Sequence, residues 1–233
     1  MVAIASAGRL GKPRYGELPG LLSLATGDVK HHPAAFSTVD VLWTLYSRVL
    51  RVDPSMHPDR DRFYLSKGHG PHAYYAVLAA HGFFPASWLG RLGTFDSPLG
   101  HHPDRMLVPG VELSSGSLGH GLPVAVGAAL ALRAQGRTKP RLLVLLGDAE
   151  LDEGSNNEAI ALAARLQLDR LTAVVIDNGS STYGWPDGIE RRFTVEGWSG
   201  VTVSGRDHAA LEEAFAAGAA DRPHVVVARV GQK

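Results

Sequence analysis

The chain has 233 residues, which is enough for one α/β domain with a sizeable core. Hydrophobic residues make up 45% and charged residues 20%, and Lys plus Arg (23) equal Asp plus Glu (23). This neutral balance excludes the charge pattern of a nucleic-acid-binding or membrane-surface protein. The absence of cysteine excludes disulfides, thiolate nucleophiles and zinc–thiolate sites. No segment is long and apolar enough to span a bilayer, and the N-terminus lacks a signal-peptide layout, so we expect a cytoplasmic protein.

The first half of the chain alternates helical patterns with loops. Residues 1–20 are rich in Gly and Pro, and we expect them to be irregular and to precede a single domain over residues 21–233. Residues 21–31 have helical spacing. Ser37 and Thr38 precede a second helical pattern that runs to residue 50, and either hydroxyl could cap that helix.

Residues 62–66 form a short β-like run that ends at the segment Lys67-Gly68-His69-Gly70. A helix is predicted over 71–81, because Pro71 is acceptable in a first turn. Residues 94–117 have the composition of a loop. The small-residue segment 118–136 predicts a further helix that ends at a glycine.

The second half predicts a parallel sheet. Continuous apolar runs, typical of strands buried on both faces, occupy residues 141–148, 171–178 and 224–230, and residues 200–204 form a weaker strand. Helical patterns at 153–167 and 207–218 lie between them. Alternation of strands and helices indicates an α/β fold, with a parallel sheet flanked by helices on both faces. Ligands of such sheets bind at the carboxyl ends of the strands.

Two oxygen-bearing side chains follow buried strands of this predicted sheet. Asp148 stands beside Gly147 at the end of one strand, and Asn178 ends the next strand, thirty residues later. If the strands are neighbours, the two side chains converge, and an anionic and a neutral oxygen together suit a divalent cation such as Mg²⁺. Each residue taken singly is also a common strand-end turn residue.

The motifs of the chain, taken together, resemble a known family. The block LLGDAELDEGSNNEA followed by VVIDN resembles the thiamine diphosphate motif, which begins Gly-Asp-Gly and ends in Asn. SKGHG, GHHPDR and VPGVELSSGSLGHGLPVAVG resemble transketolase in order and spacing, and the similarity spans roughly residues 20–218. The resemblance implies the thiamine diphosphate-binding fold and the diphosphate-binding half of a transketolase-type enzyme.

The resemblance also implies a ligand set. The metal, Mg²⁺ or Ca²⁺, is held by Asp148, the side chain of Asn178 and a main-chain oxygen of Ser180. Residues expected to bind the cofactor are His69, Gly116, Leu118, Gly147, Asp148, Ala149, Glu153 and Asn178. Ala149 departs from the glycine of the family and places a methyl group where the backbone approaches the diphosphate, which could weaken binding. Gly179 replaces a frequent second asparagine.

Transketolase chemistry moves a two-carbon ketol unit from a ketose donor to an aldehyde acceptor, so developing alkoxides need proton donors nearby. The resemblance assigns His32, His69 and His102 to the substrate channel as catalytic residues. The doubled histidine in GHHP leaves open whether His101 or His102 faces the substrate. For the other clustered histidines, His31, His72 and His120, a structural role is favoured. Changed residues around His32 leave the donor substrate open.

Half of the expected enzyme is missing from this chain. Full-length transketolases carry a second domain that binds the aminopyrimidine ring and supplies an activating glutamate, and nothing after residue 218 can encode it. We therefore expect a transferase subunit of a split enzyme, or a fragment, that is inactive alone and forms a heterotetramer with a C-terminal transketolase-like subunit. Small-residue helices at 119–135 and 153–167 suit packing against a partner or against the sheet.

Two other interpretations remain open at this point. One is a related thiamine diphosphate enzyme of the dehydrogenase E1 or acyl-transfer type, which the altered residues around His32 allow. The other is a non-catalytic regulatory subunit that keeps the fold. Retention of Asp148, Asn178 and His69 argues against the second, because a pure scaffold needs none of them. Glu158, which the resemblance places near a subunit boundary, is equally well explained as part of a solvated helix face.

Overall fold

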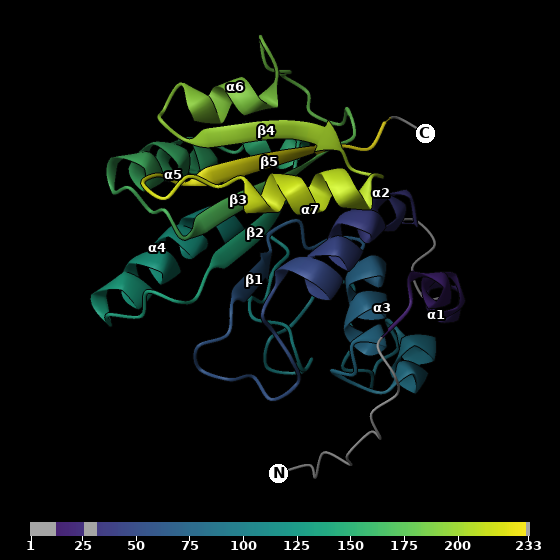
Figure 1. The fold of residues 1–233 in the computed structure, drawn as a ribbon. Helices are drawn as coiled ribbons and strands as arrows, with labels where there is room; N and C mark the ends of the chain where they lie inside the picture. The colour runs from purple at the N-terminus through teal and green to yellow at the C-terminus, as the bar shows by residue number, and fades with distance from the viewer. Residues whose placement is uncertain (1–12, 26–31, 232–233) are drawn as a thin grey trace.

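The computed structural model describes residues 13–25 and 32–231, with the backbone only for residues 32–35. Its centre is a parallel sheet of five strands in the order β1-β2-β3-β5-β4 (Figure 1). The strand bounds are β1 Arg62–Leu65, β2 Leu142–Gly147, β3 Leu171–Asp177, β4 Ser199–Ser204 and β5 His224–Arg229. The predicted parallel sheet is confirmed, including the strand at the weaker pattern near residue 200.

Helices cover both faces of the sheet, as Figure 1 shows. Alternate residues of β2, an inner strand of the sheet, point to opposite faces: Leu143 and Leu145 belong to one core, and Val144 and Leu146 to the other. The first core includes α2 (His32–Thr44), α3 (His72–Ala80) and α7 (His208–Ala216). The second includes α4 (Gly121–Ala134), α5 (Gly154–Arg165) and α6 (Ile189–Thr194). A strand buried on both sides explains why the run at 142–146 is apolar without alternation.

The amino-terminal helices differ from the sequence-based prediction. A 3-10 turn at Tyr15–Glu17 leads into α1 (Leu18–Leu24), so helical structure begins inside the segment expected to be irregular, and the helix predicted over 21–31 ends at Leu24. Pro19 is accommodated because the first turn of a helix needs no main-chain N–H there. Residues 26–31 lie outside the described part of the chain.

The expected caps of the next helix were also wrong. Helix α2 begins at His32, so Ser37 and Thr38 lie within it and do not cap it. The helix continues as a π-helical turn at Leu45–Val49 and ends at Leu50, whose N–H donates to the Leu45 carbonyl at 2.8 Å. A short helix, α6, and a 3-10 segment at Ala86–Arg91 were not expected. Within the described residues, none of the helices has the length and hydropathy needed to cross a membrane.

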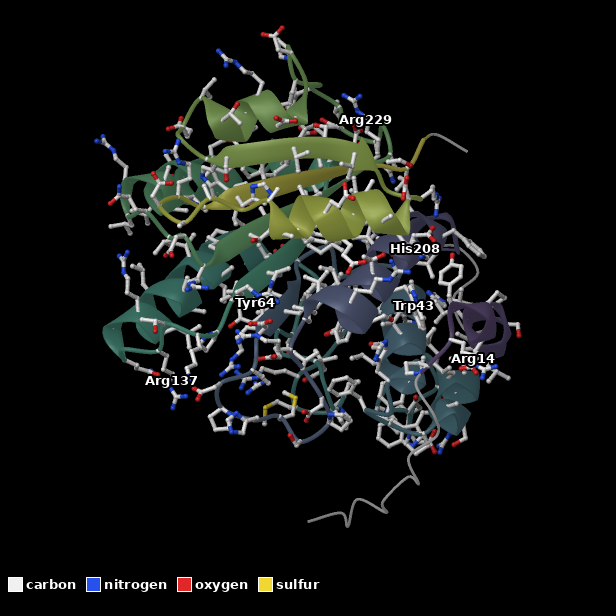
Figure 2. All side chains as sticks on the ribbon, viewed as in Figure 1. Arg14, Trp43, Tyr64, Arg137, His208 and Arg229 are labelled. Atoms are coloured by element: carbon white, nitrogen blue, oxygen red, sulfur yellow. The ribbon has the colours of Figure 1, made fainter. Side chains whose placement is uncertain are left out.

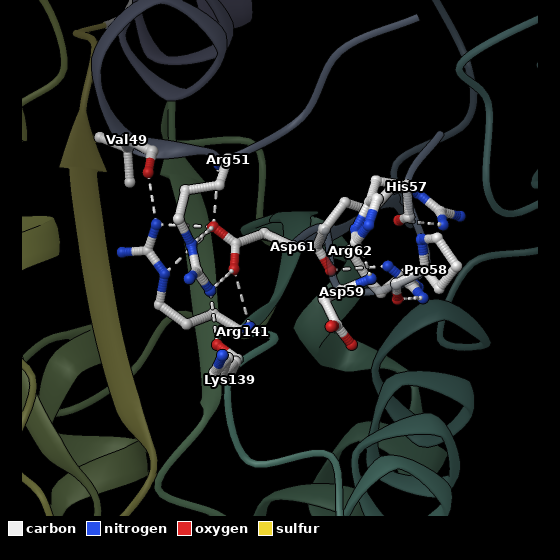
Figure 3. Close-up of polar contacts among 10 residues, drawn as sticks. Val49, Arg51, His57, Pro58, Asp59, Asp61, Arg62, Lys139 and Arg141 are labelled. Atoms are coloured by element: carbon white, nitrogen blue, oxygen red, sulfur yellow. Dashed lines mark hydrogen bonds and ion pairs between the residues drawn. The ribbon is translucent and has the colours of Figure 1, made fainter. Parts of the chain in front are cut away.

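One buried carboxylate ties together the amino ends of β1 and β2 (Figure 3). Asp61 accepts hydrogen bonds from the guanidinium groups of Arg51 and Arg141, at 2.7 Å for each terminal nitrogen. It also accepts the main-chain N–H of both arginines. Burial pushes the pKa of Asp61 upward, but these hydrogen bonds outweigh it and lower the pKa to about 2. The junction fixes the strands whose opposite ends carry the site described next.

Candidate functional site

The tips of β2 and β3 place Asp148 and Asn178 next to each other in the sheet. In the register of this pair, Gly147 lies opposite Ile176, and the Asp148 N–H donates to the Ile176 carbonyl at 3.0 Å. Asp148 therefore directly follows the end of β2 beside the last residues of β3, and Asn178 directly follows the end of β3. The predicted neighbourhood of the two strand ends is confirmed.

The Asp148 carboxylate is a buried charge held by neutral donors. It is 1% exposed. It accepts the main-chain N–H of Ala149 at 2.8 Å, the main-chain N–H of Ser180 at 2.7 Å and the Ser180 hydroxyl. These donors orient the carboxylate, but none carries a positive charge. A buried carboxylate is more strongly stabilised when a cation also contacts it.

The side-chain oxygen of Asn178 is enclosed by the protein and accepts no hydrogen bond from any described residue. Leaving such an oxygen unsatisfied costs about 1–3 kcal/mol. An unpartnered amide oxygen at the strand end next to a buried carboxylate fits a divalent cation, which prefers oxygen ligands. Within the described residues no group of three or more His, Asp or Glu side chains could hold a metal. Further ligands would thus be main-chain oxygens, ligand oxygens or water.

A cleft of about 640 Å³ opens beside this pair at the carboxyl edge of the sheet. Asp148 and Gly179 line one side of it, and Thr202 and Arg229 line the side formed by β4 and β5. Figure 2 shows Arg229 at this edge, whereas Arg137 lies toward the opposite end of the sheet. Gly179 has a φ of +71°, which allows the chain to turn sharply after Asn178 and to bring Ser180 back onto Asp148.

A second buried carboxylate, Glu150, joins three loops around the site. It is 1% exposed. It accepts the Ser66 hydroxyl, the Gly119 N–H at 3.0 Å and the Gly147 N–H at 3.3 Å. The Gly121 N–H in turn donates to the Ser66 hydroxyl at 2.9 Å. The loops that carry the SKGHG, GSLGHG and GDAELDEG motifs are therefore fastened to one side chain.

Close packing explains several glycines of these motifs. A β-carbon added to Gly119, whose φ is +81°, would lie 2.6 Å from the β-carbon of Glu153. One added to Gly121 would lie 2.2 Å from the β-carbon of Ser66, and one added to Gly68 would lie 2.7 Å from the Gly116 nitrogen. Real β-carbons do not approach that closely, so side chains at these positions would separate the loops.

Lys67 is 5% exposed and lies close enough to Glu150 and Asp148 to be attracted by both carboxylates. Its aliphatic stem covers the tip of β2, because a β-carbon added to Gly147 would lie 3.3 Å from the Lys67 Cδ. Burial lowers the pKa of Lys67 to about 8, although attraction to Glu150 and Asp148 acts in the opposite direction. Neither Lys67 nor Glu150 was predicted as a site residue from the sequence. A lysine directly after a buried strand, between Ser66 and Gly68, was a signal for the first of them.

The structure describes the side chains of His69, His101 and His102 but not that of His32. The His102 ring lies beside Gly116, since a β-carbon added there would be 3.2 Å from the ring Cδ2. The His101 ring packs against Gly93 instead, at 2.9 Å from an added β-carbon. His102 is thus the member of the pair that borders the GSLGHG loop. His69 is half-buried on the loop after β1. His32 begins α2, but its side chain lies outside the described part of the chain.

The remaining predicted residues lie in the GSLGHG loop, directly after Asp148, or on α5 and its start. Leu118 is half-buried in the GSLGHG loop, and Glu153 is exposed at the start of α5. Ala149 does not have a positive φ, so the alanine fits without backbone strain. Glu158 is exposed on α5. The ligand and catalytic roles of all these residues stay predictions.

Comparison with known proteins gives a consistent picture. A family model described as "Transketolase, thiamine diphosphate binding domain" matches residues 24–231. The chain belongs to this family. The resemblance seen in the motifs is thereby confirmed, and the fold class with it.

Two relatives cover most of this chain. The chain is 52% identical to the protein named ferredoxin fas2 of Rhodococcoides fascians over 218 residues, which cover 93% of this chain and 72% of that protein. It is 39% identical to a protein of Actinobacillus succinogenes named as one subunit of apulose-4-phosphate transketolase, over 85% of this chain and 75% of that protein. The name of that first relative refers to a ferredoxin. This chain contains no cysteine, so it lacks the ligands of a cysteine-held iron–sulfur cluster.

A solved structure agrees as well. A transketolase mutant from Pichia stipitis superposes with a TM-score of 0.81 at 27% identity, covering 92% of this chain and 35% of that chain. The chain therefore spans about a third of the length of that solved transketolase.

Proposed function

We propose that this chain is the N-terminal, diphosphate-binding subunit of a thiamine diphosphate-dependent transketolase-type enzyme. The enzyme would transfer a two-carbon ketol unit, or a related acyl unit, from a ketose donor to an aldehyde acceptor. One observation carries the proposal. In this chain of the family, Asp148 and Asn178 lie at the tips of adjacent strands. The Asp148 carboxylate is buried and held by neutral donors, and the Asn178 side-chain oxygen accepts no hydrogen bond from the described residues. A scaffold would have no need for this arrangement.

The strand tips would hold the metal and the cofactor. Asp148 and Asn178 would bind Mg²⁺, or Ca²⁺, with a main-chain oxygen of Ser180, and the cation would link them to the diphosphate. Gly116, whose backbone is exposed, and Gly147, at the tip of β2, would lie against the cofactor. When bound, thiamine diphosphate supplies an electron sink that allows a carbon–carbon bond beside a carbonyl to break. The protein has to supply position and proton transfer.

The histidines are the proposed proton-transfer groups. His69 follows Lys67 by two residues in the loop fastened to Glu150, and His102 borders the GSLGHG loop. Both would donate hydrogen bonds to substrate oxygens and exchange protons with them, since imidazole titrates near neutral pH. His32 is the third proposed member of the channel.

A second polypeptide would complete the site. Relatives of this chain are named as subunits: the apulose-4-phosphate enzyme above, and 6-deoxy-6-sulfo-D-fructose transketolase subunit SqwG of a Clostridium strain, 35% identical over 187 residues. By analogy, a C-terminal chain would bind the pyrimidine ring, and two copies of each chain would form a heterotetramer. Exposed Val124 on α4 (45%) and Leu162 on α5 (48%) offer apolar contacts for that assembly. The cytoplasmic location stays a prediction, which cell fractionation would test.

The test is cofactor binding by the complex purified through a tag on this chain. With Mg²⁺ present, calorimetry should show saturable binding of thiamine diphosphate, and a chelator should abolish it. Asp148→Ala should remove the metal-dependent binding and leave the thermal unfolding temperature nearly unchanged. Asp169→Ala, which removes an exposed carboxylate at the other end of β3, is the matched control and should bind as the wild type does.

The outcomes separate the alternatives. A wild-type complex that binds no cofactor would point to a regulatory subunit and overturn the proposal. Ketol transfer between a ketose and an aldose, measured before and after the partner is added, distinguishes transketolase chemistry from decarboxylating E1-type chemistry. Robust transfer by the chain alone would contradict the need for a partner.

A further inference from the structure

Lys67 is a buried, charged side chain at the strand tips to which the proposed function assigns no role. It is nearly fully buried, at 5% exposure, beside two carboxylates that already accept hydrogen bonds from other groups. Burying an ammonium group is costly unless a partner compensates for the lost water. A lysine retained in such a place therefore needs an explanation.

The obvious partners of Lys67 are engaged elsewhere. Glu150 receives its three hydrogen bonds from Ser66, Gly119 and Gly147. Asp148 receives its own from Ala149 and Ser180. Both carboxylates attract the ammonium group at a distance. Among the residues that the structure describes, however, none makes a hydrogen bond or a direct ion pair with it.

The stem of Lys67 defines where its ammonium group reaches. Lys67 is the second residue after the end of β1, and its main-chain N–H donates to the Leu145 carbonyl on β2 at 3.3 Å. The stem then passes over Gly147, where an added β-carbon would lie 3.3 Å from Cδ and 3.7 Å from Cε. The side chain thus runs over the tip of the strand that ends in Asp148. A side chain at Gly147 would press on the stem, and the lysine would have to shift by a few tenths of an ångström.

We propose that Lys67 is a diphosphate-binding residue, whose ammonium group donates hydrogen bonds to the terminal phosphate oxygens of the cofactor beside the metal. The proposal rests on the proposed function. A lysine ammonium is a compact charge with three donors, which suits phosphate oxygens of varied geometry. A divalent cation does not neutralise a diphosphate completely, so a second cation at the strand tip strengthens binding. The unpartnered ammonium group gains its missing acceptor in the same step.

The discriminating variant is Lys67→Met, which keeps a long apolar stem over Gly147 and removes only the charge and donors. In the complex, at saturating Mg²⁺, the affinity for thiamine diphosphate should fall roughly 10- to 100-fold, the range expected for a lost hydrogen bond to a charged group. The affinity for thiamine, which lacks the diphosphate, should not change. Calorimetry measures both. Lys139→Met, an exposed lysine at the amino end of β2, is the matched control and should change neither affinity.

Three results would overturn the inference. An unchanged affinity of Lys67→Met for thiamine diphosphate means that the ammonium group does not touch the diphosphate. An equal loss of affinity for thiamine and thiamine diphosphate means that the substitution disturbs the site as a whole. A wild-type complex that binds no thiamine diphosphate removes the proposed function as well, and this outcome is distinguishable because it appears before any substitution is made.

Discussion

Replacement of Glu150 by alanine is the sharpest test of how the site is assembled. The carboxylate is buried and accepts the Ser66 hydroxyl and the Gly119 N–H from two other loops, and the N–H of Gly147 at the end of β2. Alanine would remove every acceptor at once. The Ser66 hydroxyl can rotate to another acceptor, but the N–H groups of Gly119 and Gly147 are fixed by the backbone.

The magnitude follows from those two donors. A buried N–H left without an acceptor costs about 1–3 kcal/mol, so the pair costs roughly 2–6 kcal/mol. Removal of the negative charge offsets part of this free-energy cost, because burial disfavours the ionised carboxylate and raises the pKa of Glu150. We therefore expect Glu150→Ala to lower the free energy of unfolding by about 2–4 kcal/mol. Glu150→Gln keeps an oxygen for Ser66 and Gly119 and loses the longer bond to Gly147, so it should cost only about 1 kcal/mol.

Urea unfolding of the chain, followed by circular dichroism, measures these differences. The raised pKa adds a pH dependence with a definite sign. The folded state holds the Glu150 proton more tightly than the unfolded state, so the contribution of this group is complete below its ordinary pKa of 4.5 and is lost as pH rises through the folded value. Glu150→Gln does not titrate at this position. The difference in unfolding free energy between wild type and this variant should thus be smaller at pH 7 than at pH 4.5. A cost below about 1 kcal/mol for alanine, or a smaller cost for alanine than for glutamine, would refute the assigned role.

Two further substitutions test the surrounding structure. Asp61→Asn should destabilise the chain by about 2–4 kcal/mol in urea unfolding, because it leaves two arginines facing a neutral amide. Since the folded pKa of Asp61 is about 2, the extra stability of wild type over Asp61→Asn should disappear as pH falls from 3.8 toward 2. A difference in unfolding free energy that stays constant over this range would contradict the role given to Asp61. Gly119→Ala should cost about 2–4 kcal/mol, through its positive φ and its collision with Glu153. Gly136→Ala, also at positive φ but with open space around it, should cost only about 1 kcal/mol, and equal costs would exclude the collision.

The sheet and its functional edge could be predicted because their signals are local. The run at 142–146 is apolar at every position, and only a strand covered on both faces explains this in an α/β pattern. Once consecutive strands are taken as neighbours, Asp148 and Asn178 fall at the same edge without further information. The order of motifs then indicated which chemistry such an edge serves.

Glu150 and Lys67 were missed because their burial is created by segments far apart in the chain. In the sequence, Glu150 belongs to the acidic stretch that also contains Asp152 and Glu153, and nothing local separates it from its exposed neighbour Glu153. Its partners Ser66 and Gly119 are 84 and 31 residues away. Likewise, the GHHP doublet gave no means to place the two rings, which pack against different glycines, His101 against Gly93 and His102 against Gly116; which of them faces the substrate stays a prediction.

The charges at the tip of β2 suggest how the site would recognise its ligand. Two carboxylates, Asp148 and Glu150, and one ammonium group, Lys67, leave one uncompensated negative charge in a buried place. Under the proposed function, a diphosphate alone would meet repulsion there, while a metal–diphosphate pair would bring its cation to Asp148 and its remaining negative charge to Lys67. Because electrostatic interactions are strengthened by the low dielectric of a buried site, the two charges of the protein would then favour the pair over either component. The lysine and the aspartate would then act as one recognition unit, and the loops joined by Glu150 hold them at the required separation.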